Sequence, residues 1–348
     1  MRCLSLKTED LKSLFSQKDF NSQKDFEMPT WRETLAPLLA SSSSGVLARF
    51  PSHPLDTCKA RLQVQGSSQI KYTSLFDTLT KTARAEGMKG LYRGFGITVI
   101  GSAPATCLYL TSYDAAKTSL SSNVFAGNEF LAHFTAGMIA ETFSCILWVP
   151  IDVTKERLQI QEQGKASTNY RGSMDAIRTI LRTEGLYGIY KGYGATIASF
   201  GPYSAFYFMF YEQIKMTSTE LYYSKDSTNA TNATNATNTT SIEKKIIKEL
   251  PFWLHLINAS TASMMASFVT NPLDLIKLRL QVQRGGKGMR HSWGEYKGMI
   301  DGLRQVITTE GATGLFRGVG ARMAFHGPSM AITIASYEKF KIWWEKNL

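Results

Sequence analysis

The sequence lacks the short motifs that mark most soluble enzymes. Its 4 cysteines and 5 histidines form no CxxC or HxxxH pair, so no metal site is expected. No GxGxxG motif follows a predicted strand, and GGKG at 285–288 lacks the spacing of a phosphate-binding loop. No basic run carries interleaved aromatic residues, which argues against a nucleic-acid partner. We therefore do not expect an enzyme or a nucleic-acid-binding protein.

The sequence also has few charges and no N-terminal targeting pattern. The first 30 residues contain no long apolar segment, and their acidic residues do not fit a transit peptide, so we expect any organelle address to be internal. Charged residues make up only 19% of the chain, yet the mean hydropathy is −0.15. Such values fit a soluble protein or amphipathic helices that line a polar interior. The net charge of +11 predicts an anionic lipid surface or an anionic substrate.

What is present is a threefold repeat. The first block reads PLDTCKARLQ at 54–63, PIDVTKERLQ at 150–159 and PLDLIKLRLQ at 272–281. The second block follows as EGMKGLYRG at 86–94, EGLYGIYKG at 184–192 and EGATGLFRG at 310–318. The third reads YDAAK at 113–117, YEQIK at 211–215 and YEKFK at 337–341. We divide the chain into a disordered tail (1–32), three repeats (33–122, 123–222 and 247–348) and a polar Asn/Thr-rich loop (223–246).

The distances between blocks fit membrane-spanning helices. In every copy the last glycine of the second block precedes the acid of the third by 20 residues, and a helix of that length rises about 30 Å, the thickness of a bilayer's hydrocarbon core. We predict an all-α membrane protein with six transmembrane helices near 33–64, 91–118, 127–162, 190–218, 250–283 and 315–345. Amphipathic surface helices are expected near 73–85, 173–183 and 299–309.

The P-x-D-x-x-K-x-R-x-Q and E-G-x(4)-[YF]-[KR]-G blocks, repeated three times in register, resemble the signature of the mitochondrial carrier family. The resemblance implies a monomeric, multi-pass, pseudo-threefold bundle in the mitochondrial inner membrane, with a central cavity and no cofactor. It implies alternating-access transport of a small molecule, by antiport in our interpretation. Structural cardiolipin is expected at the turn glycines Gly94, Gly172, Gly192, Gly298 and Gly318. In the first repeat, Tyr72-Thr73-Ser74 departs from the family's Y-x-G pattern.

The resemblance further implies two rings of charge that close the bundle in turn. In each first block the Asp and the Lys are three residues apart on one helix face, and charges inside a membrane persist when they are paired or wet. The matrix-side ring would pair Asp56 with Lys155, Asp152 with Lys277 and Asp274 with Lys59, braced by Gln63, Gln159 and Gln281. The cytosolic-side ring would pair Asp114 with Lys215, Glu212 with Lys341 and Glu338 with Lys117, braced by Tyr113, Tyr211 and Tyr337. The alternative is ordinary charges at helix ends.

The substrate site is expected where the three copies differ. The candidate contacts are Arg49, Thr98, Gly101, Glu141, Ser199, Phe200, Arg322, Phe325 and His326. Three of them, Arg49, Glu141 and Arg322, are predicted to be unpaired charges inside the membrane, which by default mark function. Two cations suit a carboxylate and one glutamate suits an ammonium, so we interpret the substrate as an amino acid or a related zwitterion or carboxylate. Alternatively, Glu141 pairs with an arginine and holds the empty cavity.

Other interpretations stay open at this point. The segments at 270–282 and 318–329 resemble the branched-chain amino acid carriers, whereas 52–63 resembles the carnitine and basic amino acid carriers. A nucleotide- or coenzyme-type carrier and a proton-leak or regulatory carrier are the alternatives for function. A peroxisome or a plastid is the alternative location.

Overall fold

The computed structural model of the protein describes residues 31–66, 70–123, 129–161, 170–230, 250–284 and 295–347. Every element in these ranges is a helix, which confirms the prediction of an all-α protein. The long helices are α2 (Trp31–Val64), α4 (Phe95–Asn123), α5 (Glu129–Ile160), α8 (Tyr193–Ala230), α10 (Phe252–Val269) continued by α11 (Asn271–Val282), and α13 (Val319–Asn347). Between them lie α3 (Leu75–Leu91), α6 (Ser173–Thr183), α7 (Gly185–Ile189), α12 (Met299–Glu310) and η1 (Ala312–Phe316).

Two helix boundaries differ from the sequence prediction. The helix expected over 250–283 is interrupted at Thr270, where Pro272 near the start of α11 has no N–H to donate to the preceding turn. Pro54 and Pro150, at the same repeat position, lie inside the unbroken helices α2 and α5. Helix α8 continues to Ala230 instead of ending near 218, so the first part of the segment expected as a loop is helical. The expected tail lies outside the described residues except for Trp31 and Arg32, and so does 231–249.

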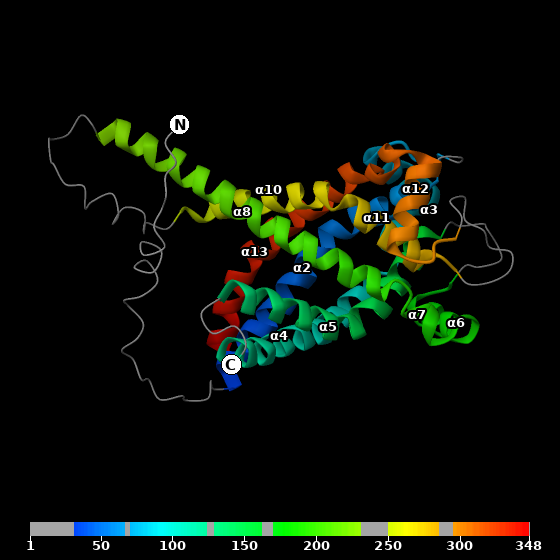
Figure 1. The fold of residues 1–348 in the computed structure, drawn as a ribbon, viewed down its shortest axis with the longest axis horizontal. Helices are drawn as coiled ribbons and strands as arrows, with labels where there is room; N and C mark the ends of the chain where they lie inside the picture. The colour runs from blue at the N-terminus through cyan, green and yellow to red at the C-terminus, as the bar shows by residue number, and fades with distance from the viewer. Residues whose placement is uncertain are drawn as a thin grey trace.

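The long helices form a closed ring. Around it, α2 contacts α4, α4 contacts α5, α5 contacts α8, α8 contacts α10, α10 contacts α13 and α13 contacts α2. The surface helices α3, α6, α7 and α12 gather at one end of the molecule (Figure 1). Toward that end α2, α5 and α11 also contact one another. The first long helices of the three repeats therefore converge there.

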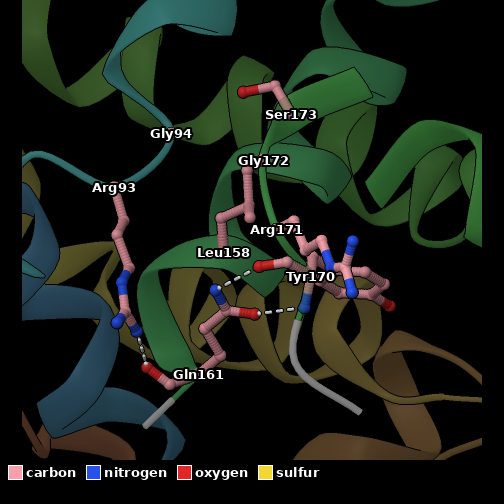
Figure 2. Close-up of a pocket in the computed structure, with 8 residues that line it drawn as sticks. All are labelled: Arg93, Gly94, Leu158, Gln161, Tyr170, Arg171, Gly172 and Ser173. Carbon is pink, nitrogen blue, oxygen red and sulfur yellow. Dashed lines mark hydrogen bonds between the residues drawn. The ribbon is translucent and has the colours of Figure 1, made fainter. Parts of the chain in front are cut away.

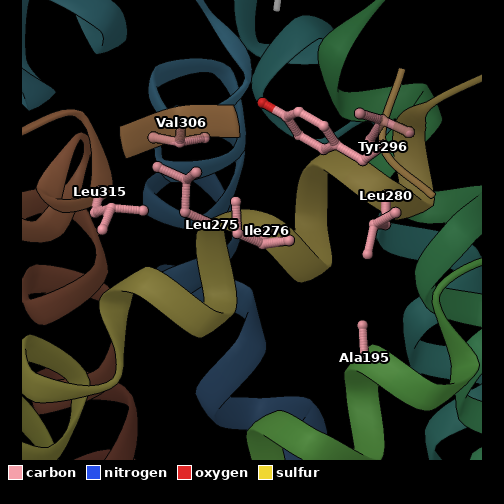
Figure 3. Packing of buried hydrophobic residues seen from close by; sticks show 8 residues of the cluster. Ala195, Leu275, Ile276, Leu280, Tyr296, Val306 and Leu315 are labelled. Carbon is pink, nitrogen blue, oxygen red and sulfur yellow. The ribbon is translucent and has the colours of Figure 1, made fainter. Parts of the chain in front are cut away.

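Small and apolar residues explain this packing. Fully buried alanines follow one another at four-residue spacing on α2, α5 and α10, as at Ala36 and Ala40 or Ala132, Ala136 and Ala140. Such spacing lets helices approach closely. At the convergent end, Leu275 and Ile276 of α11 pack with Val306 of α12 and Leu315 of η1 (Figure 3).

The outer surface of the long helices is apolar, as a membrane environment requires. Large side chains such as Ile100, Phe208 and Trp253 are more than half exposed. By length and composition alone, two helical stretches could cross a membrane, Phe95–Leu120 of α4 and Leu131–Ile160 of α5. The other long helices carry more charge, and part of it, such as Asp56 and Lys59 of α2, is buried inside the ring. Six membrane spans therefore stay a prediction.

Candidate functional site

The matrix-side ring lies where α2, α5 and α11 converge. Nζ of Lys155 is 2.9 Å from Oδ2 of Asp56, Nζ of Lys59 is 2.8 Å from Oδ2 of Asp274, and Nζ of Lys277 is 3.2 Å from Oδ2 of Asp152. All six side chains are at most one-fifth exposed. The three pairs run α2 to α5, α5 to α11 and α11 to α2, so each repeat is joined to both others.

Two of the three expected glutamine braces are present. Nε2 of Gln159 donates to Asp56 at 3.2 Å, and Nε2 of Gln63 donates to Asp274 at 3.3 Å. The prediction for Gln281 was wrong, because its Nε2 faces the hydroxyl of Thr196 on α8 at 3.4 Å. The pair that lacks a brace, Asp152 with Lys277, is also the longest and the most exposed of the three. The ring is therefore not symmetric.

Arg322 joins the ring instead of standing free. Its Nε lies 3.2 Å from Oδ2 of Asp274, and its Nη1 donates to the carbonyl of Ser267 at 2.7 Å and to the hydroxyl of Thr270 at 3.1 Å. The expectation that Arg322 is an unpaired charge was wrong. The cause is the break at Thr270, which places a free carbonyl and a hydroxyl opposite α13.

A second set of buried ion pairs surrounds the ring, and sequence reasoning missed it. Arg61, Arg157 and Arg279, the arginines of the first blocks, bind the glutamates that open the second blocks at 2.7, 2.5 and 2.5 Å. Those glutamates are Glu86, Glu184 and Glu310. The sequence did contain a signal for these pairs, because a glutamate opens the second block in all three repeats. These pairs fix each surface helix to its own long helix.

The same arginines also bind the next repeat. Nε of Arg61 donates to the carbonyl of Gln159 at 2.9 Å, and Nε of Arg157 donates to that of Gln281 at 3.1 Å. Nε of Arg279 closes the cycle on the carbonyl of Gln63 at 3.0 Å. We call this cycle, together with the three Arg–Glu pairs, the arginine girdle. Its arginines are nearly or completely inaccessible to solvent.

Three of the predicted lipid glycines have a packing reason of their own. Gly94, Gly192 and Gly318 adopt φ values of 79°, 80° and 75°, which L side chains rarely adopt. A Cβ at Gly192 would also come within 2.8 Å of Cγ of Gln281, and one at Gly318 within 2.9 Å of Cγ of Gln63. These turns therefore pack directly against the neighbouring repeat.

The cytosolic-side ring is open in this structure. Within the described residues, no ion pair joins one member of this ring to another; the six are Asp114, Lys117, Glu212, Lys215, Glu338 and Lys341. Nζ of Lys341 instead lies 3.9 Å from Oε1 of Glu345 on its own helix. Five of the six are exposed. The tyrosines have other partners: the phenol of Tyr113 lies 2.6 Å from Nδ1 of His133, and that of Tyr211 lies 3.2 Å from Nδ1 of His255. Tyr337, the third of the set, is half-buried.

Arg49 and Glu141 remain without an ion pair among the described residues. The guanidinium of Arg49 on α2 lies 5.2 Å from the ring centroid of Trp148 on α5. Glu141 on α5 accepts long contacts of 3.4 Å from the Ser144 hydroxyl and the Cys145 thiol. Trp148 lies seven residues, about two helical turns, after Glu141 on α5. Arg49 therefore contacts the helix that carries Glu141 about two turns away from it.

The remaining substrate candidates have different surroundings, and at least one of them serves helix packing. His326 lies 5.5 Å from the ring of Tyr203 and 4.9 Å from that of Phe325, and Phe200 packs edge-on against Tyr109 at 6.5 Å. Thr98 and Ser199 are buried, and their hydroxyls donate to carbonyls of their own helices. A Cβ at Gly101 would overlap the side chain of Ile151 on α5, so Gly101 serves helix packing.

A pocket of about 220 Å³ lies between the first and second repeats. It is lined by Arg93, Gly94, Leu158, Gln161, Tyr170, Arg171, Gly172 and Ser173 (Figure 2). Nη1 of Arg93 donates to the carbonyl of Gln161 at 2.6 Å, and the side chain of Gln161 holds the backbone of Tyr170. No side chain caps the start of α6 at Gly172, whereas Ser74 caps α3 by accepting from the N–H of Asp77.

A ring of helices with a closed buried charge network at one end, an open one at the other and free charges between them defines a membrane solute carrier. The family model described as "Mitochondrial carrier protein" matches residues 30–124, 127–221 and 248–348. The chain belongs to the mitochondrial carrier family, whose members are transporters and not enzymes.

Relatives extend over most of the chain. It is 33% identical over 314 residues to "Mitochondrial substrate carrier family protein E" of Dictyostelium discoideum, covering 88% of this chain and 95% of the relative. It is 28% identical over 336 residues to human "Mitoferrin-1", covering 95% and 90%. It is 30% identical over 318 residues to "Mitoferrin" of Dictyostelium discoideum, covering 87% and 92%. None of these three relatives is named as an amino acid carrier, so they do not support that part of the sequence prediction.

Proposed function

We propose that the protein carries a small solute with a carboxylate and an ammonium group, an amino acid or a near relative, across the mitochondrial inner membrane. Its matrix-side and cytosolic-side rings would open alternately, and solutes would be exchanged. The observation that carries the proposal is the pair of uncommitted charges, Arg49 and Glu141, on neighbouring helices of the bundle interior. The match to the mitochondrial carrier family and the similarity to mitoferrins support this location.

The chemistry of the two side chains supports a zwitterion. A guanidinium binds a carboxylate through two parallel hydrogen bonds, and a glutamate binds an ammonium. Because Arg322 is held by Asp274, Ser267 and Thr270, it is not available to a second carboxylate. This favours a solute with one carboxylate over a dicarboxylate or a polyphosphate.

Iron is the second candidate, because two of the relatives above are named mitoferrin. A divalent iron ion in transit would need His, Cys, Asp or Glu side chains gathered around it. Among the described residues, no group of three or more such side chains could hold a metal ion. The geometry therefore supports the organic solute better.

The test is a ligand screen followed by uptake. The full-length protein is purified in detergent with cardiolipin, and its thermal transition is recorded with amino acids, carnitines, carboxylates, nucleotides and ferrous iron. A ligand at 100 times its Kd stabilises the folded state by about 2.7 kcal/mol. We expect shifts with amino acids, and uptake of the same compounds in labelled form into proteoliposomes loaded with the unlabelled compound.

Variants locate the site. Arg49→Ala and Glu141→Gln should each abolish the shift and the uptake, whereas Ser267→Ala, at the repeat position of Arg49, should retain both. The Ser267 hydroxyl is buried without a partner, so its loss should leave the fold intact. A shift only with iron, or only with a nucleotide, would contradict the amino acid proposal and leave the family unchanged.

We also propose that the pocket in Figure 2 holds the phosphate of an anionic lipid such as cardiolipin. Support comes from the uncapped start of α6 and from Arg93 and Arg171, since a helix N-terminus with nearby cations favours phosphate. Arg171→Ala should reduce the cardiolipin retained in native mass spectra. The same change at exposed Arg178, farther along α6, is the control.

A further inference from the structure

Two histidines hold tyrosines that the cytosolic-side ring would use as braces. Nδ1 of His133 on α5 lies 2.6 Å from the phenol oxygen of Tyr113 on α4, and the two rings stack 6.3 Å apart at 28°. Nδ1 of His255 on α10 lies 3.2 Å from the phenol oxygen of Tyr211 on α8. We call these two contacts the tyrosine latches. Each latch joins the second long helix of one repeat to the first long helix of the next repeat.

The third seam between repeats has no such histidine. His133 and His255 both lie 17 residues before the proline of their first block, and the same position of the first repeat holds Pro37. The side chain of proline has neither a donor nor an acceptor. Tyr337, the tyrosine of this seam, makes no hydrogen bond through its phenol among the described residues. Two braces are therefore latched and one is free.

The latched tyrosines lie on the inner faces of their helices, where the ring would form. Tyr113 stacks on Tyr109, one helical turn away, with the rings nearly parallel at 10°. Tyr109 in turn contacts Phe200 of α8, although α5 stands between α4 and α8 in the ring of helices. This contact therefore crosses the bundle interior. Tyr211 has the same repeat position on α8 and stacks on Tyr207 at 6.1 Å.

A latch and a brace compete for the same phenol. The pairs of the cytosolic-side ring would form between α4, α8 and α13, whereas His133 and His255 belong to α5 and α10. A phenol that is bound to its histidine is held against a different helix from the one that carries its ring partner. In whichever direction the proton of the latch points, closing the ring therefore requires the latch to break. The open ring and the two latches occur together in this structure, as this competition requires.

We infer that His133 and His255 are positioning residues that hold Tyr113 and Tyr211 out of the cytosolic-side ring and so favour its open form. This inference rests on the alternately opening rings of the proposed function. A hydrogen bond changes an equilibrium by about two- to tenfold, so each histidine lowers the population of the closed ring by about that factor. Because Tyr337 has no latch to give up, closing costs least at the seam between α13 and α2.

The test measures the population of the closed ring and needs no solute. Spin labels are attached through Thr118→Cys on α4 and Met216→Cys on α8, in the full-length protein with its 4 native cysteines replaced by alanine. Both positions are exposed. Pulsed electron paramagnetic resonance gives the distances between the labels in cardiolipin-containing liposomes at about pH 8, where an ordinary histidine is neutral. The ring pairs require α4 and α8 to approach each other, so short distances report the closed ring.

Matched variants separate the hydrogen bond from the ring contact. His133→Phe keeps a ring for stacking but removes the nitrogen, and should raise the ratio of short to long distances about two- to tenfold. His133→Asn offers Oδ1 in place of Nδ1 and should keep the wild-type ratio. In a Tyr113→Phe background, which has no latch to lose, His133→Phe should change nothing. Equal effects of the Phe and Asn variants would assign His133 a packing role and overturn the inference.

The other two seams supply independent tests. His255→Phe should act like His133→Phe, and the two changes together should multiply their effects. Pro37→His should lower the ratio of short to long distances, because it gives Tyr337 a partner, and it leaves both native histidines in place. An unchanged distance distribution in the double Phe variant would overturn the inference.

Uptake separates this inference from the proposed substrate. Proteoliposomes that take up labelled amino acids, but whose protein shows the same label distances in every variant, would refute the latches and leave the proposed function standing. Distances that shift as expected in a protein that takes up no amino acid would contradict the proposed substrate and support the latches.

Discussion

The matrix-side and cytosolic-side rings contain the same types of residue at the same spacing, but only one of them is paired. The matrix-side ring has three ion pairs of 2.8 to 3.2 Å. The cytosolic-side ring, within the described residues, has none. What differs is the surroundings: α2, α5 and α11 converge around the first ring, whereas five of the six charges of the second are exposed. Residue pattern therefore determines which pairs can form, and the helix arrangement determines which of them do.

This difference has an energetic counterpart. Exposed ion pairs contribute about 0–1 kcal/mol, whereas removing one partner of a buried pair costs about 3–5 kcal/mol. Breaking the matrix-side ring therefore costs several kcal/mol of free energy, whereas rearranging the cytosolic-side ring costs little. Four predictions test the contrast.

The largest effect is expected in the arginine girdle. Glu310→Gln leaves the fully buried guanidinium of Arg279 without its counter-ion, which should destabilise the protein by about 3–5 kcal/mol. Glu338→Gln, in the open ring, should change stability by less than about 0.5 kcal/mol. Thermal unfolding in detergent measures both. Equal losses in the two variants would contradict the contrast between buried and exposed charge.

A smaller effect should separate the pairs of the matrix-side ring. Asp56→Asn removes a carboxylate that binds both Lys155 and Gln159, whereas Asp152→Asn removes one that binds Lys277 without a glutamine. Asp56→Asn should therefore lower the thermal transition more. A double variant with Gln159→Ala isolates the brace, because the extra cost of Asp56→Asn should shrink in that background.

The tyrosine contacts at the open end should matter less. Tyr113→Phe removes a hydroxyl that lies 2.6 Å from His133, and a hydrogen bond contributes about 0.5–1.5 kcal/mol. We expect a loss near the lower limit, because the contact is exposed. Tyr337→Phe, with no hydrogen bond to its phenol among the described residues, serves as the comparison and should be neutral.

The smallest effect concerns the surface helices, outside the membrane. The backbone N–H of Lys297 lowers the pKa of Asp301 at the start of α12, and that of Thr73 lowers the pKa of Asp77 at the start of α3. A lowered carboxyl pKa stabilises the folded state above the unfolded pKa, and this contribution disappears as the pH falls through the folded value. Asp301→Asn should thus be slightly less stable than wild type at neutral pH and equal to it in acid. A difference that grows in acid would contradict this.

The sequence predicts the partners within the matrix-side ring well and the neighbours of that ring poorly. Asp56 and Lys155 can be matched because one block repeats three times around a threefold bundle. Arg322 could not be matched to Asp274, because the contact depends on the helix break at Thr270, which the equivalent prolines of α2 and α5 do not produce. Gln281 donates to Thr196, whereas Gln159 donates to Asp56 although a threonine, Thr98, also stands at the repeat position of Thr196. Contacts that depend on differences between repeats are lost when the repeats are read as equivalent.

Glutamates of the second blocks illustrate a different limit. The repeat makes these glutamates easy to recognise in the sequence, but their arginine partners lie 25 to 31 residues earlier on other helices. The glutamates are Glu86, Glu184 and Glu310. Only the fold shows that the first and second blocks of a repeat meet. The extension of α8 to Ala230 was missed for another reason, since its Ser-, Thr- and Asn-rich composition favours a loop.

The arginine girdle is cyclic, so each of the three repeats makes the same contact with the next one and none stands at an end. Each arginine reaches the following repeat, and the third reaches the first. The first and the last of the described helices also meet, since Nε1 of Trp344 on α13 donates to Oγ of Ser43 on α2 at 3.4 Å. A circularly permuted protein, joined by a linker between residues 347 and 31 and opened within 231–249, would preserve all three joints. The order of the three repeats along the chain is therefore not what holds this cycle of contacts together.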